Sequence, residues 1–173
     1  MQFLSISEGS TTLGLGPVES FVAEVADQLV DSAGFEIPTD SCRKSALAQL
    51  ISKLAPSKPP VLLWVTGWGV WPSCENWDLF YGYRRSLGET RQLIDAPLHV
   101  FTSTDQPALA SMVSLVLFFG WDAHVVSITG DFMLTISHDE WFELQLPCQA
   151  DGSEAIGEID RFGLRRIGMG VGS

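Results

Sequence analysis

Hydrophobic residues recur at helical spacing in the first third of the chain. Between residues 17 and 33, apolar positions repeat at intervals of three and four while acids occupy the opposite side. This pattern predicts an amphipathic helix that stops at Gly34. A second amphipathic helix is predicted between a cap at Asp40 or Thr39 and the breaker Pro56.

A third helical segment begins near Asp105 and ends at Gly120, and it is apolar nearly all round. Its apolar run is shorter than the roughly 20 residues that a bilayer requires. We therefore expect a buried core helix and no membrane span.

Five segments have the pattern of β-strands. Residues 61–65 form an uninterrupted apolar run, which is typical of a strand buried on both faces. Residues 122–128 and 132–136 alternate on either side of a turn with glycine at its centre, which predicts a hairpin. The remaining strand candidates are residues 3–6 and 98–102.

The end of the chain is less regular. Ser137 and Glu140 follow the hairpin with the spacing of a capping box, which predicts a short helix. From about 150 onward the periodicity fades, and we expect a mobile C-terminal tail. Together the elements predict one domain, 1–173, of the α/β or α+β class: a mixed sandwich of roughly 4–5 strands with helices packed on the sheet.

Composition and charge narrow the classes of function. The 173 residues are 46% hydrophobic and 18% charged, which argues against disorder. The formal net charge is -11, and neither 1–42 nor 92–160 contains Lys or Arg. Such a surface argues against direct nucleic-acid binding and favours encounter with a basic protein partner. The alternative is that the acids only keep an apolar domain soluble.

Cysteine usage and the N-terminus bear on the compartment. Three cysteines in a chain of this length form no disulfide framework, and the first residues lack the pattern of a signal peptide. We therefore expect a cytoplasmic protein.

The densest unusual segment, 68–85, holds three of the six Trp, both Tyr and two adjacent Arg. These residue types dominate interface hot spots, so the segment is a candidate protein-binding surface and would also suit a homodimer. The alternative is that the aromatics fill a secondary core while the arginines pair with nearby acids. The candidate anchors are Trp68, Trp71, Trp77, Tyr81, Tyr83, Arg84 and Arg85.

A second candidate site is polar. Asp122 and His124 are two apart on a predicted strand and share a face, while His138 and Asp139 follow the hairpin. A metal site, or a histidine base oriented by a carboxylate, would use these groups. The competing interpretation is a surface histidine beside a helix cap. Cys74 is a further candidate, as a reactive thiolate, although lone cysteines are more often inert.

No metal, nucleotide or hydrolase motif is present, so we assign no catalytic residue, metal or cofactor. In size, acidity and lack of a catalytic signature, the chain is similar to many small bacterial immunity and antitoxin proteins. That resemblance rests on composition and implies neutralisation of a partner by occupation of its surface. The leading expectation is an acidic interaction module; the alternative is a small enzyme or ligand-binding domain with an acidic Asp/His pocket.

Overall fold

A computed structural model describes residues 1–56, 60–68, 77–147 and 150–168. These residues form a mixed α+β fold, which confirms the predicted class, but the predicted strand number was too low because eight strands are present. The strands are β1 (Gln2–Leu4), β2 (Asp31–Glu36), β3 (Val61–Gly67), β4 (Leu98–Phe101), β5 (Asp122–Ser127), β6 (Met133–Ser137), β7 (Trp141–Leu146) and β8 (Arg166–Ile167).

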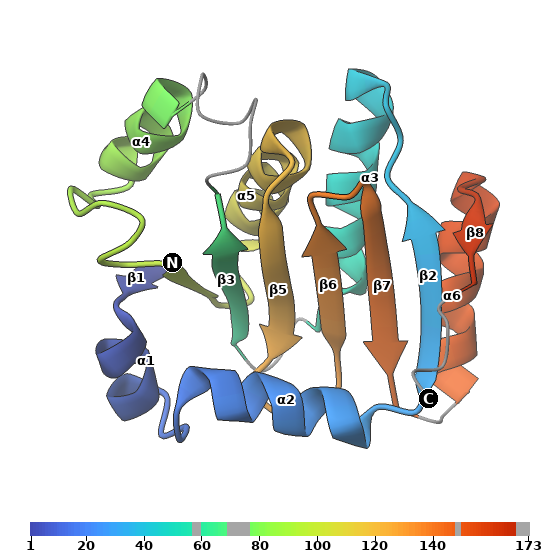
Figure 1. The fold of residues 1–173 in the computed structure, drawn as a ribbon, viewed down its shortest axis with the longest axis horizontal. Helices are drawn as coiled ribbons and strands as arrows, with labels where there is room; N and C mark the ends of the chain where they lie inside the picture. Colours follow the sequence, from blue (N-terminus) through green and yellow to red (C-terminus); the bar gives the residue numbers. More distant parts are fainter. Residues whose placement is uncertain (57–59, 69–76, 148–149, 169–173) are drawn as a thin grey trace.

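All eight strands belong to one antiparallel sheet with the order β1-β4-β3-β5-β6-β7-β2-β8 (Figure 1). The short strands β1 and β8 lie at the two edges. The long strands β3, β5, β6, β7 and β2 therefore form its centre, where main-chain groups pair on both sides.

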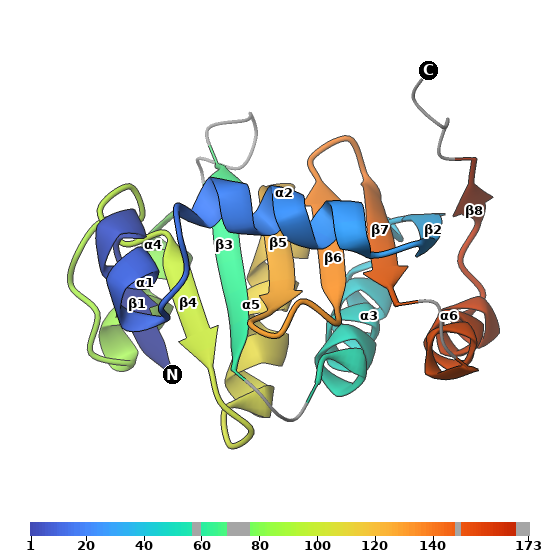
Figure 2. The ribbon, with the colours of Figure 1, turned by 90° about the horizontal axis from the view of Figure 1, so that it is seen from below.

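Helices cover the two faces of the sheet unequally. Helices α3, α5 and α6 lie on one face, while α2 crosses the other face near one end of the strands (Figures 1 and 2). Helices α1 and α4 lie at the β1 end of the sheet. The helices are α1 (Ile6–Thr12), α2 (Val18–Gln28), α3 (Ser41–Leu54), α4 (Trp77–Ser86), α5 (Gln106–Phe119) and α6 (Ala150–Phe162).

The helix α2 uses the apolar spacing seen in the sequence. Val18, Val22 and Val25 are buried against a cluster that includes Leu62 and Val126 of the sheet. The predicted end at Gly34 was wrong, because the helix ends at Gln28 and the chain continues directly into β2.

The structure confirms the predicted buried core helix, which is α5. It ends at Gly120, whose φ of 61° is the left-handed conformation of a helix C-cap. Val113 and Val116 are fully buried between the helix and the sheet. Among the described residues no helix has the length and apolarity to cross a membrane.

The predicted hairpin is also present as β5 and β6, with Gly130 at φ 73° in the turn. The prediction of a short helix after the hairpin was wrong. Ser137 to Glu140 instead make a tight turn, with Glu140 at φ 65°, and the chain returns as β7. The region from about 150 contains α6 and β8, and Ile159 of α6 is fully buried.

Candidate binding face

Side chains on the α2 side of the sheet fall into rows across the central strands. The row beneath α2 is apolar and includes Leu62, Val126 and Met133. Two further rows continue toward the other end of the strands, and among the described residues no helix packs over them (Figure 1). We call these two rows the open half-face. Its members are Trp64, His124, Thr135, Glu143 and Gly34 in one row and Asp122, Ser137, Trp141 and Glu36 in the next.

The first row carries polar and aromatic groups in direct contact with one another. His124 lies between Trp64 and Thr135 in the strand register. Its ring centroid is 5.8 Å from that of Trp64, and its Nδ1 is 3.2 Å from the Thr135 hydroxyl. These side chains and Glu143 are half-buried, so each keeps part of its surface in water.

The second row holds a carboxylate and imidazole pair. Both oxygens of Asp122 are 2.9 Å from Nδ1 of His138, and the backbone N–H of His138 donates to the same carboxylate at 2.9 Å. Asp139 is 3.5 Å from the other ring nitrogen. The structure thus brings together Asp122, His138 and Asp139 of the predicted polar site.

A glycine makes room for this carboxylate. A Cβ atom on Gly67 would lie 2.6 Å from Oδ2 of Asp122, which is closer than van der Waals contact allows. The strand β3 therefore requires a residue without a side chain at the point where β5 begins.

The two histidines near Asp122 have opposite electrostatic environments. The hydrogen bond and charge of Asp122 raise the pKa of His138 above its ordinary value. Burial lowers the pKa of His124, although the charge of Asp122 opposes that shift. Asp122 therefore stabilises the charged form of His138, while burial favours the neutral form of His124.

The cluster is open to water and lies beside a cavity. Within the ranges that the structure describes, no group of three or more His, Cys, Asp or Glu side chains could hold a metal ion. His138 and Asp122 remain 37% and 31% exposed, so water reaches the pair from outside. His138 also borders a cavity of about 260 Å³ at the end of α5, together with Glu140 and Lys44. The Lys44 ammonium donates to the Leu117 carbonyl at 3.0 Å.

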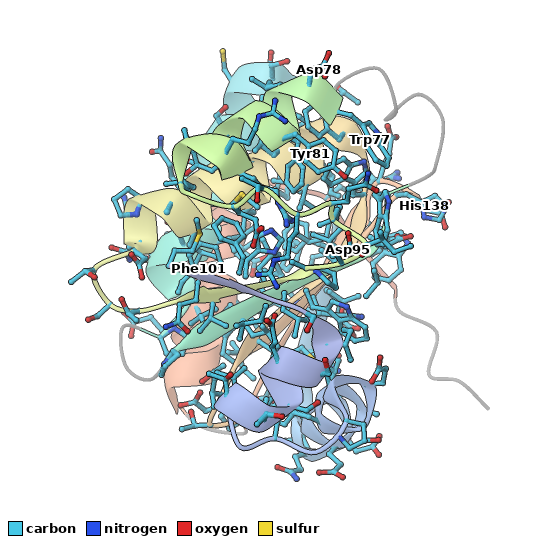
Figure 3. All side chains as sticks on the ribbon, turned by 90° about the vertical axis from the view of Figure 1, so that its left-hand side faces the viewer. Trp77, Asp78, Tyr81, Asp95, Phe101 and His138 are labelled. Atoms are coloured by element: carbon cyan, nitrogen blue, oxygen red, sulfur yellow. The ribbon has the colours of Figure 1, made fainter. Side chains whose placement is uncertain are left out.

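The aromatic residues of 68–85 lie elsewhere, on and around α4. The rings of Trp77 and Tyr81 are 5.6 Å apart, and Figure 3 shows both side chains on α4, apart from His138. The Tyr81 hydroxyl accepts a hydrogen bond from the Leu93 N–H at 3.1 Å. Trp68, Tyr81 and Tyr83 are partly buried against the main core. Trp71 and Cys74 lie outside the described residues.

The two arginines of this segment are in different environments. Arg85 is exposed, whereas Arg84 is fully buried and is not available to a partner in this conformation. Both terminal nitrogens of Arg84 donate to the Ala96 carbonyl at 3.0 Å, and one lies 3.2 Å from Nε2 of His99. The guanidinium carbon lies 5.1 Å from the Phe3 ring centroid. Burial lowers the pKa of Arg84, which nevertheless stays a cation at neutral pH.

Several members of the open half-face were not singled out from the sequence. Trp64 was assigned only to a buried strand, and Trp141 to a helix that does not form. The alternation of Trp141, Glu143 and Gln145 with buried neighbours would have shown β7 and its polar face.

Comparison with known proteins yields no relative, because no protein-family model, curated protein or solved structure matches the chain.

Proposed function

We propose that this chain is an acidic, non-enzymatic interaction module that binds a basic surface of a partner protein through the open half-face. The observation that carries the proposal is that α2 covers only one end of the central strands, and no other helix in the described part of the chain covers the two rows beyond it. The uncovered rows contain two tryptophans and three carboxylates, Asp122, Glu143 and Glu36.

Tryptophan is among the residue types that dominate binding energy at protein interfaces. Trp64 and Trp141 are both half-buried, so each is held by the fold while it still presents surface. Between them lie the imidazole of His124, the side chains of Thr135 and Asp122, and Glu143, which form a face that a protein partner can contact broadly. This arrangement supports recognition of a macromolecule over a small ligand.

Charge around the face supports a cationic partner. Glu36 is paired with Arg165, but no cation among the described residues is in salt-bridge contact with Glu143, and Asp139 and Glu140 extend the negative rim. The exposed acids of α2 border the same side of the sheet. An acidic surface accelerates encounter with a basic protein and disfavours nucleic acid.

The finer form of the proposal is neutralisation. A module that covers a basic functional surface of its partner blocks that surface by occupying it, without any chemical step. This function needs no cofactor, and it suits a cytoplasmic protein of the immunity or antitoxin type. The exposed Arg85 and the aromatic side chains around α4 remain candidates for a second contact region.

The test is capture of the partner by matched variants. The tagged protein is incubated with lysate of the native host at low and high salt, and retained proteins are identified by mass spectrometry. We expect one stoichiometric basic protein at low salt, lost with Glu143→Lys and kept with Glu154→Lys. The control makes the same charge change at an exposed position of α6, on the opposite side of the sheet. A partner held equally by both variants would contradict the proposal.

A second candidate function rests on the contact between Asp122 and His138. A histidine whose Nδ1 is held by a carboxylate has the arrangement of an oriented general base. In this alternative the acidic site comprises Asp122, His124, His138 and Asp139. Native mass spectrometry of the purified protein tests it, because a bound small molecule that disappears in His138→Asn would favour a ligand-binding domain.

A further inference from the structure

We infer that the partner element that lies on the open half-face is a basic amphipathic α-helix, which crosses the strands beside α2 as a second helix of that layer. This inference rests on the proposed function and specifies its partner. It follows from the dimensions of the uncovered area, from the hydrogen bonding of the strands below it, and from the charge of the side chains on it.

The uncovered area has the dimensions of one helix. Rows on one face of a sheet are about 6.6 Å apart along the strands, so two rows extend for about 13 Å, while a helix with side chains is about 10 Å wide. The five strands from β3 to β2 are separated by four spacings, or about 19 Å. A helix of about 13 residues spans that distance.

The helix α2 shows that this sheet accepts a helix across its strands. It crosses the central strands (Figures 1 and 2) and buries its valines against side chains from β3, β5 and β6. Gln28 of α2 lies beside Gly130 in the turn at the covered end. By helical geometry, Ala26 and Ala23 lie on the other flank, toward the open half-face. Glu19, two turns before Ala26, lies on the same flank, which therefore combines two alanines that permit close approach of a neighbouring helix with one carboxylate.

An extended segment would gain little on this face. The open half-face lies over the centre of the sheet, where the strands β5, β6 and β7 each pair with neighbours on both sides. A bound strand would therefore find no free ladder to extend, and its own main-chain groups would lose water without replacement. A helix satisfies its main chain internally and presents only side chains.

The side chains on the face specify the chemistry of that helix. Glu143, and Asp122 beside its partner His138, call for lysine or arginine on the contacting side. These positions are about two helical turns apart, because β5 and β7 are separated by two strand spacings, about 10 Å. Trp64 on β3 and Trp141 on β7 call for apolar residues on the partner helix that are about three strand spacings apart.

The experiment uses a defined probe and the full-length protein. The probe is a 16-residue stapled helical peptide with lysine and leucine on one face, compared with a scrambled peptide of equal charge and with a version containing proline at its centre. Binding is measured by fluorescence anisotropy and mapped by amide hydrogen exchange. We expect added protection in β5, β6 and β7, and binding at least about tenfold weaker with Glu143→Lys but unchanged with Glu154→Lys.

Equal binding of the scrambled or proline-containing peptide would overturn the inference, as would protection confined to another surface. The native partner, once captured, gives an independent check by cross-linking from a photoreactive residue in place of the exposed Thr66. Cross-links to a non-helical partner segment would overturn the helix while the proposed function stands. Capture that is insensitive to Glu143→Lys would instead remove the proposed function.

Discussion

Acid sensitivity of folding is expected to depend strongly on His99, which is a fully buried residue of β4 beside Arg84. Burial, with a further contribution from the Arg84 cation, lowers the pKa of this imidazole to about 3. In the neutral ring, Nδ1 is 3.3 Å from the Leu63 carbonyl and can donate to it, while Nε2 accepts from Arg84. A second proton on the ring would remove that acceptor and place two cations in contact.

The magnitude follows from linkage between protonation and folding. In the unfolded chain the imidazole has an ordinary pKa of about 6.5, so it takes up a proton as the pH falls below that value, whereas the folded protein does so only near 3. Stability is therefore fully present above about pH 6.5 and is lost as the pH falls toward 3. Between pH 6.5 and 4.5 the loss amounts to about 2.3 kcal/mol from this residue.

The assay is urea denaturation of the wild type and of His99→Gln at pH 7.0 and 4.5. Glutamine keeps one donor and one acceptor but does not titrate, so the variant is expected to lose about 2 to 3 kcal/mol less than the wild type on acidification. Contributions from His124, His138 and the carboxylates are common to both proteins and cancel in the comparison. Equal losses in the two proteins would refute a buried, neutral His99.

Three further substitutions test other parts of the structure. In urea denaturation, Arg84→Met should lower the free energy of unfolding by about 2 to 4 kcal/mol, because it leaves buried acceptors without a donor. Arg85→Met should change it by less than about 0.5 kcal/mol, because Arg85 is exposed. Similar costs for the two variants would contradict the different burial of the two residues. Gly67→Ala should cost about 1 kcal/mol, also by denaturation, since its Cβ meets the Asp122 carboxylate; an unchanged midpoint would contradict that contact. Asp122→Asn should lower the pKa of His138 in an NMR titration, and an unchanged pKa would show that the pair does not form in solution.

The elements predicted correctly from the sequence are those in which the local residue pattern and the burial in the folded protein favour the same structure. The helix α5 combines a long apolar run with Pro107 in its first turn and Gly120 at its end, and it forms as expected. The β5 and β6 hairpin has alternation on both sides of Gly130. In both cases the local conformational preference and the burial pattern favour the same structure.

Other elements were missed because two patterns overlap in the sequence. Leu29 continues the helical spacing of α2, so the helix was extended over residues that form β2. Ser137 and Glu140 have the spacing of a helix cap, yet Glu140 adopts a left-handed turn and β7 follows. The extended conformation of β2 and β7 is stabilised by their pairing with each other and by the pairing of β7 with β6. Local sequence does not show the β2–β7 pairing, because the two strands are far apart in the chain.

The arrangement of some candidate site residues could be predicted from the sequence, and that of others could not. Strand alternation places Asp122 and His124 on one face, and the structure agrees. The burial of Arg84 is not evident from composition, because arginine is rarely fully buried. Its position four residues after the buried Phe80, on the same side of α4, was the available signal.

The gradient of polarity along the central strands bears on the kind of complex that the open half-face can form. On the α2 side, β5 changes from Val126 to His124 to Asp122, and β6 changes from Met133 to Thr135 to Ser137. Both strands become polar in register, at the row where contact with α2 ends. Permanent interfaces are as apolar as a domain core, whereas this face is suited to contact with water. If the proposed partner binds this face, we expect it to associate and dissociate, with steering by charge and anchoring by tryptophan.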